Sequence, residues 1–267
     1  MDAATSIERT HGELIDWHEA QLSEHAELTE VLEREPNLTV AQAYAVQAAL
    51  MQRRIRQGDG LIGYKAALTS KPMQAAVGID EPVMGTLLGA SMLPEGEPIS
   101  VRNMIKATVE PEMAVVLSHD LTGPDVTLLQ AQTAVAAWFP AVEVGDIRTG
   151  EKRRSLQMTI CSNTFNGGQV VGGPPLAPGG FDPRVEGMVL RHNGEAVGSA
   201  TGVEVLGHPL EAVVFIANKL AELGLGGLKA GQVIMTGSIV KSVAVAPGDE
   251  ITAEFTRLGR LSLRFAQ

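Results

Sequence analysis

Apolar and polar residues repeat with helical spacing in three parts of the chain. The spacing predicts helices over residues 5–33, over the segment that follows Thr39, and over residues 208–223. Thr39 and Gln42 stand at the two positions of a capping box, and Gly58 is placed to end the second helix. The chain is therefore expected to begin with helices and to carry one more near its C-terminal end.

From Leu61 onward, short apolar runs separated by glycine and proline predict β-strands. These strands are expected over residues 61–67, 109–118, 140–146, 157–161, 168–172, 186–191, 232–236 and parts of 251–265. Residues 172–183 contain eight glycines or prolines and predict an exposed connection. Helices first and strands afterwards favour an α+β fold over a doubly wound parallel sheet. We expect an N-terminal helical segment over residues 1–60 and a β-rich domain over residues 61–267.

The composition supports a folded core. Of the 267 residues, 45% are hydrophobic and only 19% are charged, which argues against disorder. Much of the net charge of −10 lies in residues 1–35, where ten acids face two arginines. We expect this acidic helix face, including the evenly spaced His11, His18 and His25, to be exposed to solvent. Lysine and arginine form no cluster, so nucleic acid is not an expected partner.

Cysteine usage and hydropathy set the expected location. Cys161 is the only cysteine, so an intrachain disulfide and a cysteine-based metal cage are both excluded. The N-terminal residues lack the basic start and apolar core of a signal peptide. No apolar run approaches the ~18 residues that indicate a membrane span. We therefore expect a cytoplasmic protein with no membrane partner and a buried Cys161.

The stretch VEPEMAVVL places Glu110 and Glu112 two residues apart in a predicted strand. Side chains two apart point to the same face of a strand, and two like charges held so close repel unless a cation or a proton lies between them. Glu143, in a later predicted strand, is a candidate third carboxylate for a hard divalent cation. A solvated acidic strand edge is the alternative.

A second polar group interrupts the segment LIGYKAAL. Lys65 lies among apolar residues, where an ammonium is costly unless it is paired or its head reaches water. Thr69 and Ser70 follow with hydroxyl groups, and Asp80 lies in a turn between two apolar blocks. Lys65 is therefore a candidate partner for a carboxylate-bound metal or for an anionic substrate.

Over about residues 38–265 the chain resembles the 2-oxo-acid hydratase and decarboxylase branch of the fumarylacetoacetate hydrolase superfamily. The resemblance rests on many motifs that occur in the same order. They are G-x-K and L-T-S within 63–70, Q-x-x-x-G-I-D-E-P-x-x-G at 74–85, E-x-E at 110–112, P-A-x-E-V-x-D-x-R at 140–148, LGHPLEAVVFIANKLAELG at 206–224, LKAGQVIMTGS at 228–238 and V-A-P-G-D at 245–249.

The resemblance implies a mixed β-sheet roll or barrel with an inserted helix. It also implies that Glu110, Glu112 and Glu143 bind Mg²⁺ or Mn²⁺, which chelates a 2-oxo or 2-hydroxy carboxylic acid and stabilises its enolate. Lys65 would stabilise negative charge or move protons, and Asp80 would be an acid–base partner. Residues implied to line the substrate pocket are Thr69, Ser70, Asn163, Phe165, Thr236 and Ser238. The resemblance also implies a homo-oligomer and a complex with a sister enzyme of the same pathway.

The sequence departs from the family pattern at one point. Where the family usually reads D-N-A-S, this chain has Ser162, Asn163, Thr164 and Phe165. A buried aromatic ring adds roughly 150–250 Å² of apolar surface, so Phe165 is expected to favour a substrate with one carboxylate and a neutral tail.

Three functions stay open. The first is a metal-dependent hydratase that adds water to a 2-hydroxy-2,4-dienoate and forms a 4-hydroxy-2-oxo acid in aromatic-compound catabolism. The second is a decarboxylase of a 2-oxo-3-enedioate, of the 4-oxalocrotonate type. The third is an accessory subunit with an altered active site.

Overall fold

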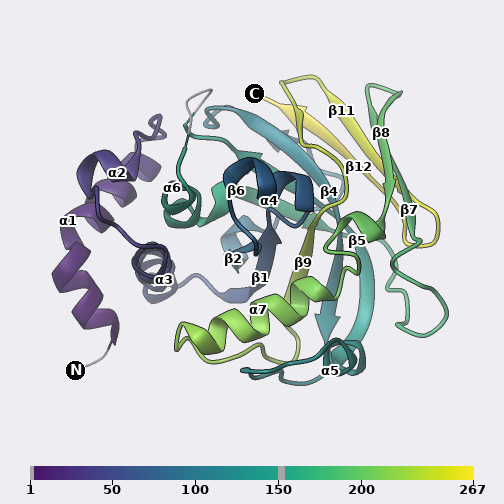
Figure 1. Cartoon of the computed structure of the whole chain (residues 1–267). Coiled ribbons are helices and arrows are strands. Elements are labelled where there is room, and N and C mark those ends of the chain that lie inside the picture. The colour runs from purple at the N-terminus through teal and green to yellow at the C-terminus, as the bar shows by residue number, and fades with distance from the viewer. Residues whose placement is uncertain (1–2, 150–153) are drawn as a thin grey trace.

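Two β-sheets and a group of N-terminal helices make up the computed structural model, which describes residues 3–149 and 154–267. The helices within residues 3–56 lie on the opposite side of the molecule from the strands within residues 187–201 and 250–266 (Figure 1). The helices within residues 71–77, 156–161 and 211–222 lie nearer the middle, beside the strands of the first sheet. The predicted α+β class, with a mixed sheet and an inserted helix, is confirmed.

The helices are short apart from three. Their bounds are α1 (Ala3–Ser23), α2 (Val31–Arg34), α3 (Val40–Arg56), α4 (Lys71–Val77), α5 (Leu128–Ala134), α6 (Leu156–Cys161) and α7 (Glu211–Glu222). Three 3₁₀ turns accompany them, namely η1 (Gly89–Ser91), η2 (Asn163–Phe165) and η3 (Gly202–Glu204).

The first sheet carries the candidate chemistry. Its strands run in the order β2 (Val83–Leu88), β1 (Leu61–Ala67), β9 (Val233–Ser238), β4 (Ala107–Leu117), β5 (Val135–Asp146) and β6 (Asn166–Val171), and β10 (Val243–Ala244) also pairs with β4. Strands β1 and β9 are parallel, whereas the other pairs in this sheet are antiparallel. The sheet is therefore mixed, as predicted.

The second sheet contacts strand β5 of the first sheet through its strands at residues 250–255 and 259–266. Its strands run in the order β3 (Ile99–Ser100), β12 (Gly259–Ala266), β11 (Glu250–Phe255), β7 (Gly187–His192) and β8 (Glu195–Thr201). Inward residues alternate with exposed ones along β12, where Leu261, Leu263 and Phe265 are buried. Both sheets contribute to one hydrophobic core.

The prediction of one helix over residues 5–33 is wrong. Helix α1 has a non-helical residue at His11 and ends at Ser23, and only a short α2 follows. His11 and His18 are buried, which corrects the expectation of a solvated histidine face. The reason is that Leu14 and Ile15 pack into the core, so the neighbouring face of α1 is buried with them.

The predicted second helix is confirmed as α3. Thr39 and Gln42 form the expected capping box, and Gly58 follows the helix with a φ of +105°. Gln47, on the buried face, donates through Nε2 to the carbonyls of Met84 and Ile160 at 3.0 and 2.9 Å. This amide ties α3 to strand β2 and to helix α6.

The predicted strand at residues 157–161 is wrong, because this segment forms helix α6. Ser155 caps it by accepting a hydrogen bond from the backbone N–H of Met158 at 3.0 Å. A short apolar run has no decisive period, so the cap and the packing against α3 determine its structure. Cys161, at the end of α6, is buried as expected.

The connection at 172–183 is mostly exposed, as predicted. Leu176 is an exception, because its backbone exchanges two hydrogen bonds with Trp138. Elements that the sequence pattern did not predict include α4, α5, β2 and β8.

Candidate active site

Three glutamates meet on neighbouring strands of the first sheet. Glu110 and Glu112 point to the same face of β4, and Glu143 lies directly opposite Glu110 on β5. One carboxylate oxygen from each residue lies within 4.8 Å of the others. The pairing of β4 with β5 therefore brings together residues that are 31 to 33 positions apart in sequence. We call this group the glutamate triad.

Burial makes the triad costly as three negative charges. Glu112 is fully buried and Glu143 is 3% exposed. Burial, with the charge of Glu143 as the next cause, raises the pKa of Glu110 to about 7. The same two causes raise the pKa of Glu112 well above its ordinary value. The site therefore favours either bound protons or a bound cation.

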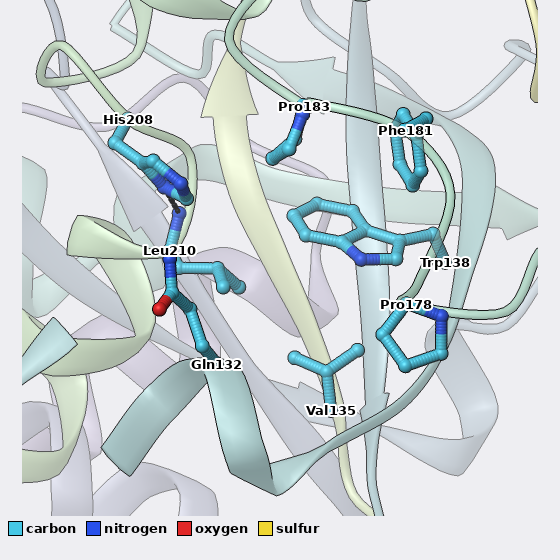
Figure 2. Close-up of a pocket in the computed structure, with 8 residues that line it drawn as sticks. All are labelled: Gln132, Val135, Trp138, Pro178, Phe181, Pro183, His208 and Leu210. Atoms are coloured by element: carbon cyan, nitrogen blue, oxygen red, sulfur yellow. Dashed lines mark hydrogen bonds between the residues drawn. The ribbon is translucent and has the colours of Figure 1, made fainter. Parts of the chain in front are cut away.

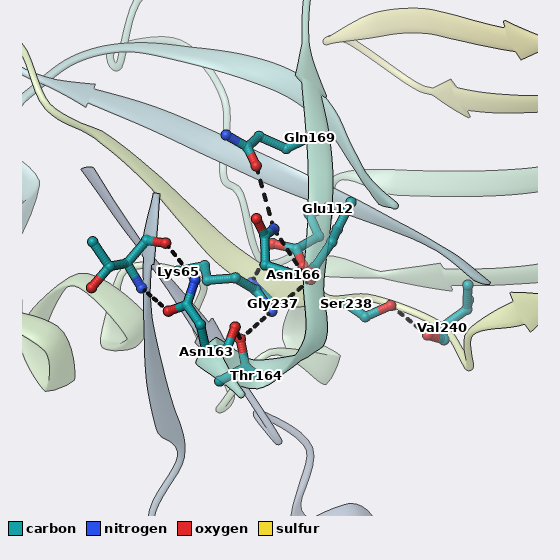
Figure 3. Close-up of polar contacts among 11 residues, drawn as sticks. Lys65, Glu112, Asn163, Thr164, Asn166, Gln169, Gly237, Ser238 and Val240 are labelled. Carbon is teal, nitrogen blue, oxygen red and sulfur yellow. Dashed lines mark hydrogen bonds and ion pairs between the residues drawn. The ribbon is translucent and has the colours of Figure 1, made fainter. Parts of the chain in front are cut away.

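Glu112 is held by one oxygen and leaves the other available. Its Oε2 accepts a hydrogen bond from the backbone N–H of Gly237 at 2.8 Å (Figure 3). Its Oε1 is buried and has no hydrogen-bond partner among the described residues. A buried carboxylate oxygen without a partner is an unfavourable arrangement that a metal ligand bond relieves.

Lys65 places a positive charge in direct contact with the triad. Its Nζ lies 2.7 Å from Glu143 Oε2 and donates to Thr164 Oγ1 at 2.9 Å, and the residue is 2% exposed. Burial by itself would lower the pKa of this ammonium, but the charges of Glu143, Glu112 and Glu110 raise it above its ordinary value. Lys65 is thus held as a cation beside the carboxylates, and its head does not reach water.

Two amides from β6 extend the network. Asn166 Nδ2 donates to Glu143 Oε1 at 3.1 Å and to Gln169 Oε1 at 3.3 Å (Figure 3). Gln169 is fully buried and lies opposite Glu143 across the β5–β6 pair. Both oxygens of Glu143 are therefore oriented, one by Lys65 and one by Asn166.

A left-handed turn presents Thr164 to Lys65. Asn163, Thr164 and Phe165 all have a φ between +50° and +57°, a region that L-residues other than glycine rarely occupy. The Asn163 side chain fixes the turn by accepting from Thr86 N at 2.7 Å and donating to Thr86 O at 2.8 Å. The packed strand β2 thus supports a strained backbone next to the buried lysine.

The triad fits a hard divalent cation. All three candidate ligands offer carboxylate oxygens, which Mg²⁺, Mn²⁺ and Ca²⁺ prefer, and one of these oxygens is buried without a partner. The described residues place no cysteine or histidine in this cluster, so the donor set does not resemble a zinc site.

Two of the expected pocket residues use their hydroxyl groups to bond backbone carbonyls. Thr236 Oγ1 donates to Met113 O at 2.9 Å, and Ser238 Oγ donates to Val240 O at 2.6 Å. Ser238 faces Glu112 across the β4–β9 pair. Both residues therefore stand beside the triad, with hydroxyl protons directed at the backbone.

Thr69 and Gly237 form a close contact at the end of β1. Thr69 is 3% exposed, and a β-carbon at Gly237, whose φ is +106°, would lie 2.4 Å from Thr69 Oγ1. Only glycine fits here, and its N–H reaches Glu112 as a result. Ser70, the next expected residue, is half-buried and precedes α4 without a side-chain capping bond.

Asp80 is not brought to the triad in this conformation. It is exposed and follows α4, and its backbone carbonyl accepts a hydrogen bond from Lys71. Its role as an acid–base partner stays a prediction.

Phe165 is buried in the hydrophobic core, and the guanidinium of Arg154 lies 5.1 Å from its ring centre. Thr164 therefore holds the position beside Lys65, while Phe165 faces a cation. The expected influence of Phe165 on the substrate tail stays a prediction.

A cavity of about 530 Å³ lies between α4 and α6. It is lined by Glu30, Leu32, Leu68, Met73, Val77, Arg154, Ser155, Leu156 and Thr159. Leu68 directly precedes Thr69, so the cavity reaches the end of β1, the strand that carries Lys65.

Another hollow, shown in Figure 2, lies outside the triad. Trp138 from β5 and Phe181 from the exposed connection meet there edge to face, with ring centres 5.5 Å apart. His208 Nδ1 accepts from Leu210 N at 3.1 Å on the other side of this hollow. None of its lining residues belongs to the triad.

Sequence reasoning missed Thr164, Asn166, Gln169, Gly237 and Arg154 as residues that surround the triad. Thr164 lies in the segment that departs from the family pattern, and the two amides follow this segment within four residues, so the departure is the signal that could have drawn attention to them. Arg154 carried no such signal, because only tertiary packing brings it to Phe165.

Residues 39–266 match the family described as "Fumarylacetoacetate (FAA) hydrolase C-terminal". The chain is 36% identical over 246 residues to the 4-oxalocrotonate decarboxylase of Pseudomonas putida, covering 92% of each chain. It is 36% identical over 238 residues to the 2-oxo-hept-4-ene-1,7-dioate hydratase of Escherichia coli, covering 86% of this chain and 88% of the relative.

A solved structure gives the same relationship. The 4-oxalocrotonate decarboxylase of Pseudomonas putida G7, complexed with magnesium and adipate, superposes with a TM-score of 0.91 at 34% identity. The match covers 95% of this chain and 96% of that one.

None of the helices in the described ranges combines the length and apolar character that a membrane crossing needs.

Proposed function

Because this chain belongs to the fumarylacetoacetate hydrolase family, we propose that it is a metal-dependent lyase that acts on a 2-oxo or 2-hydroxy carboxylic acid. Its reaction is the addition of water to a 2-hydroxy-2,4-dienoate, which gives a 4-hydroxy-2-oxo acid. One observation carries this proposal, namely three clustered carboxylates, two of them buried and one half-buried, with an unpartnered oxygen on Glu112 and an ammonium beside them.

Glu110, Glu112 and Glu143 would hold Mg²⁺ or Mn²⁺, which supplies a Lewis acid for the 2-oxo and carboxylate oxygens of the substrate. Lys65 provides a fixed positive charge that stabilises the negative charge of an enolate in a water-poor site. Thr164 accepts a hydrogen bond from Lys65 Nζ and so helps to hold this ammonium beside Glu143 of the triad. As an ammonium, Lys65 would also be the proton donor to an enolate bound at the triad.

Asn166 and Gln169 have a positioning role. Asn166 bonds one oxygen of Glu143 and the side chain of Gln169, so the carboxylate is fixed before any ligand arrives. Groups that orient a metal ligand in this way raise its affinity for the metal. We therefore assign these amides to the support of Glu143, not to contact with the substrate.

Decarboxylation of a 2-oxo-3-enedioate is the second candidate. It is favoured by the similarity to a decarboxylase over 92% of the chain and by the TM-score of 0.91 with a decarboxylase structure. Both reactions pass through the same kind of enolate, so the triad and Lys65 serve either one.

The test is an assay of the purified protein with a 2-hydroxy-2,4-dienoate and with 2-oxo-3-hexenedioate, each with Mn²⁺ or with EDTA. We expect Mn²⁺-dependent consumption of the dienoate, with Glu250→Gln as active as the wild type, because Glu250 is exposed on the second sheet. Faster release of CO₂ from the enedioate than hydration of any dienoate would replace the first candidate by the second. Inactivity on both would leave the accessory subunit.

The proposal also divides the chain into a helical segment (1–60) and a catalytic domain (61–267).

A homo-oligomer is the last part of the proposal. Large apolar residues at the surface, including Leu129 at 69% and Val185 at 70% exposure, are available for contact with another copy. Light scattering at micromolar concentration tests the assembly, and a clean monomer would contradict it.

A further inference from the structure

Arg154 is a cation in the cavity between α4 and α6, and it has no carboxylate partner among the described residues. It is exposed, and its guanidinium lies over the ring of Phe165. No hydrogen bond or ion pair of this side chain is found within residues 3–149 and 154–267. An arginine held by an aromatic face keeps its donors free for a planar anion such as a carboxylate.

The contacts of Phe165 place this cation near the triad. On one side of Phe165, Thr164 accepts a hydrogen bond from Lys65, and on the other side, Asn166 donates to Glu143. Burial lowers the pKa of the Arg154 guanidinium, and the charge of Glu110 opposes this shift. The guanidinium therefore stands next to the site without belonging to the triad.

The cavity between α4 and α6 gives the space that a ligand would need. Arg154 lines it together with the apolar side chains of Leu68, Met73 and Val77. Its one acid, Glu30, is already engaged, because its oxygens accept hydrogen bonds from Ser155 N, Ser155 Oγ and Leu32 N. The described walls therefore fit a short hydrocarbon chain, and among the described residues that line them Arg154 carries the one charge without a partner.

We propose that Arg154 binds a second carboxylate at the far end of the substrate, so that the preferred substrate is dicarboxylic. The inference rests on the proposed function, because the first carboxylate must be bound at the triad. It reverses the expectation from the sequence that Phe165 favours a neutral tail. In the folded chain the ring of Phe165 packs against the guanidinium of Arg154.

The test compares Arg154→Leu and Arg154→Lys with the wild type on two substrates of equal length. These are 2-hydroxyhepta-2,4-dienedioate and the monocarboxylic 2-hydroxyhepta-2,4-dienoate, both with saturating Mn²⁺. We expect Arg154→Leu to lower kcat/KM for the dicarboxylate by about 10- to 100-fold, the usual loss for a hydrogen-bonded charge. The value for the monocarboxylate should change by less than about threefold, and Arg154→Lys should restore part of the preference.

Arg260→Leu is the matched control, because Arg260 is an exposed arginine on β12 in the second sheet. It should leave both values unchanged. Equal losses on both substrates in Arg154→Leu would overturn the inference, as would a wild-type preference for the monocarboxylate. Inactivity of the wild type on every substrate would instead refute the proposed function, so the two failures are distinguishable.

Inhibition by unreactive acids gives a second readout. Adipate carries two carboxylates and hexanoate carries one, and their chains have the same number of carbons. We expect adipate to inhibit the wild type more strongly than hexanoate, and Arg154→Leu to remove this difference while Arg260→Leu retains it. An unchanged ratio of inhibition constants in Arg154→Leu would refute the role of this arginine.

Discussion

Replacing Glu112 by glutamine should separate metal binding from folding. Glu112 is fully buried, and the bond that its Oε2 accepts from Gly237 N can be accepted by the amide oxygen of glutamine. The substitution therefore retains the shape and one hydrogen bond but removes one charge from the triad. In EDTA, the variant should be at least as stable as the wild type, because fewer like charges are buried together.

In Mn²⁺ the order should reverse. A ligand at 100 times its Kd stabilises the folded state by about 2.7 kcal/mol, which corresponds to roughly 5–11 °C in Tm for a chain of this size. If the loss of one ligand oxygen weakens binding about 100-fold, the same Mn²⁺ concentration contributes only about 0.4 kcal/mol. The metal-induced shift should therefore fall to about 1–2 °C.

Thermal unfolding in EDTA and in Mn²⁺ measures both effects, with Glu250→Gln as the control that should keep the full wild-type shift. A Glu112→Gln variant with the same Mn²⁺ shift as the wild type would refute the assignment of the triad. A variant that is much less stable in EDTA would refute the argument from buried like charges.

Three further predictions concern the residues around the triad. Lys65→Met removes the charge 2.7 Å from Glu143, and it should lower the free energy of unfolding without metal by about 3–5 kcal/mol and kcat/KM by at least about 100-fold. Lys229→Met, at an exposed ion pair, should change neither quantity. Urea unfolding in EDTA and the Mn²⁺ assay measure the two quantities, and equal effects in the two variants would contradict the prediction. Because the pKa of Glu110 is raised to about 7, the folded state holds the proton of this carboxyl group more tightly than the unfolded chain does. The contribution of the bound proton to metal-free stability is therefore present at low pH and is lost as pH rises through 7. Tm in EDTA between pH 5 and 8 should fall more steeply in the wild type than in Glu110→Gln, and parallel curves would exclude this contribution. Gly237→Ala, with its β-carbon 2.4 Å from Thr69 Oγ1, should lower the free energy of unfolding by about 1–3 kcal/mol more than Gly231→Ala, whose β-carbon meets no atom within 4 Å. Equal urea midpoints for the two variants would show that the close contact at Gly237 has no cost.

Local pattern was sufficient for the part of the site that lies within regular strands. The two-residue spacing of Glu110 and Glu112 on an apolar strand predicted their common face, and the strand itself was predicted within two residues of its bounds. Lys65 was recognised because a charge within an apolar strand needs a partner, and Glu143 is that partner. These inferences required only the alternation of side chains along a strand.

The missed features depend on contacts between distant segments. Helix α6 was predicted as a strand because its short apolar run has no decisive period, and its cap and the contacts of Gln47 decide the outcome. The left-handed turn that contains Thr164 is held by Thr86, 77 positions from Asn163, so no local propensity indicates it. His18 is buried because α1 packs on α3, although its sequence neighbours are acidic.

The parallel pairing of β1 with β9 determines when during synthesis the site can be completed. Residues 63–65 pair with residues 233–235, so the strand that carries Lys65 waits for a neighbour that emerges from the ribosome about 170 residues later. The same late strand brings Gly237, whose N–H holds Glu112. A nascent chain that stops before β9 has β4 and β5 but lacks the amide that orients one of its carboxylates. A divalent cation bound at the triad would therefore stabilise a chain that includes β9 more than a chain that stops before it.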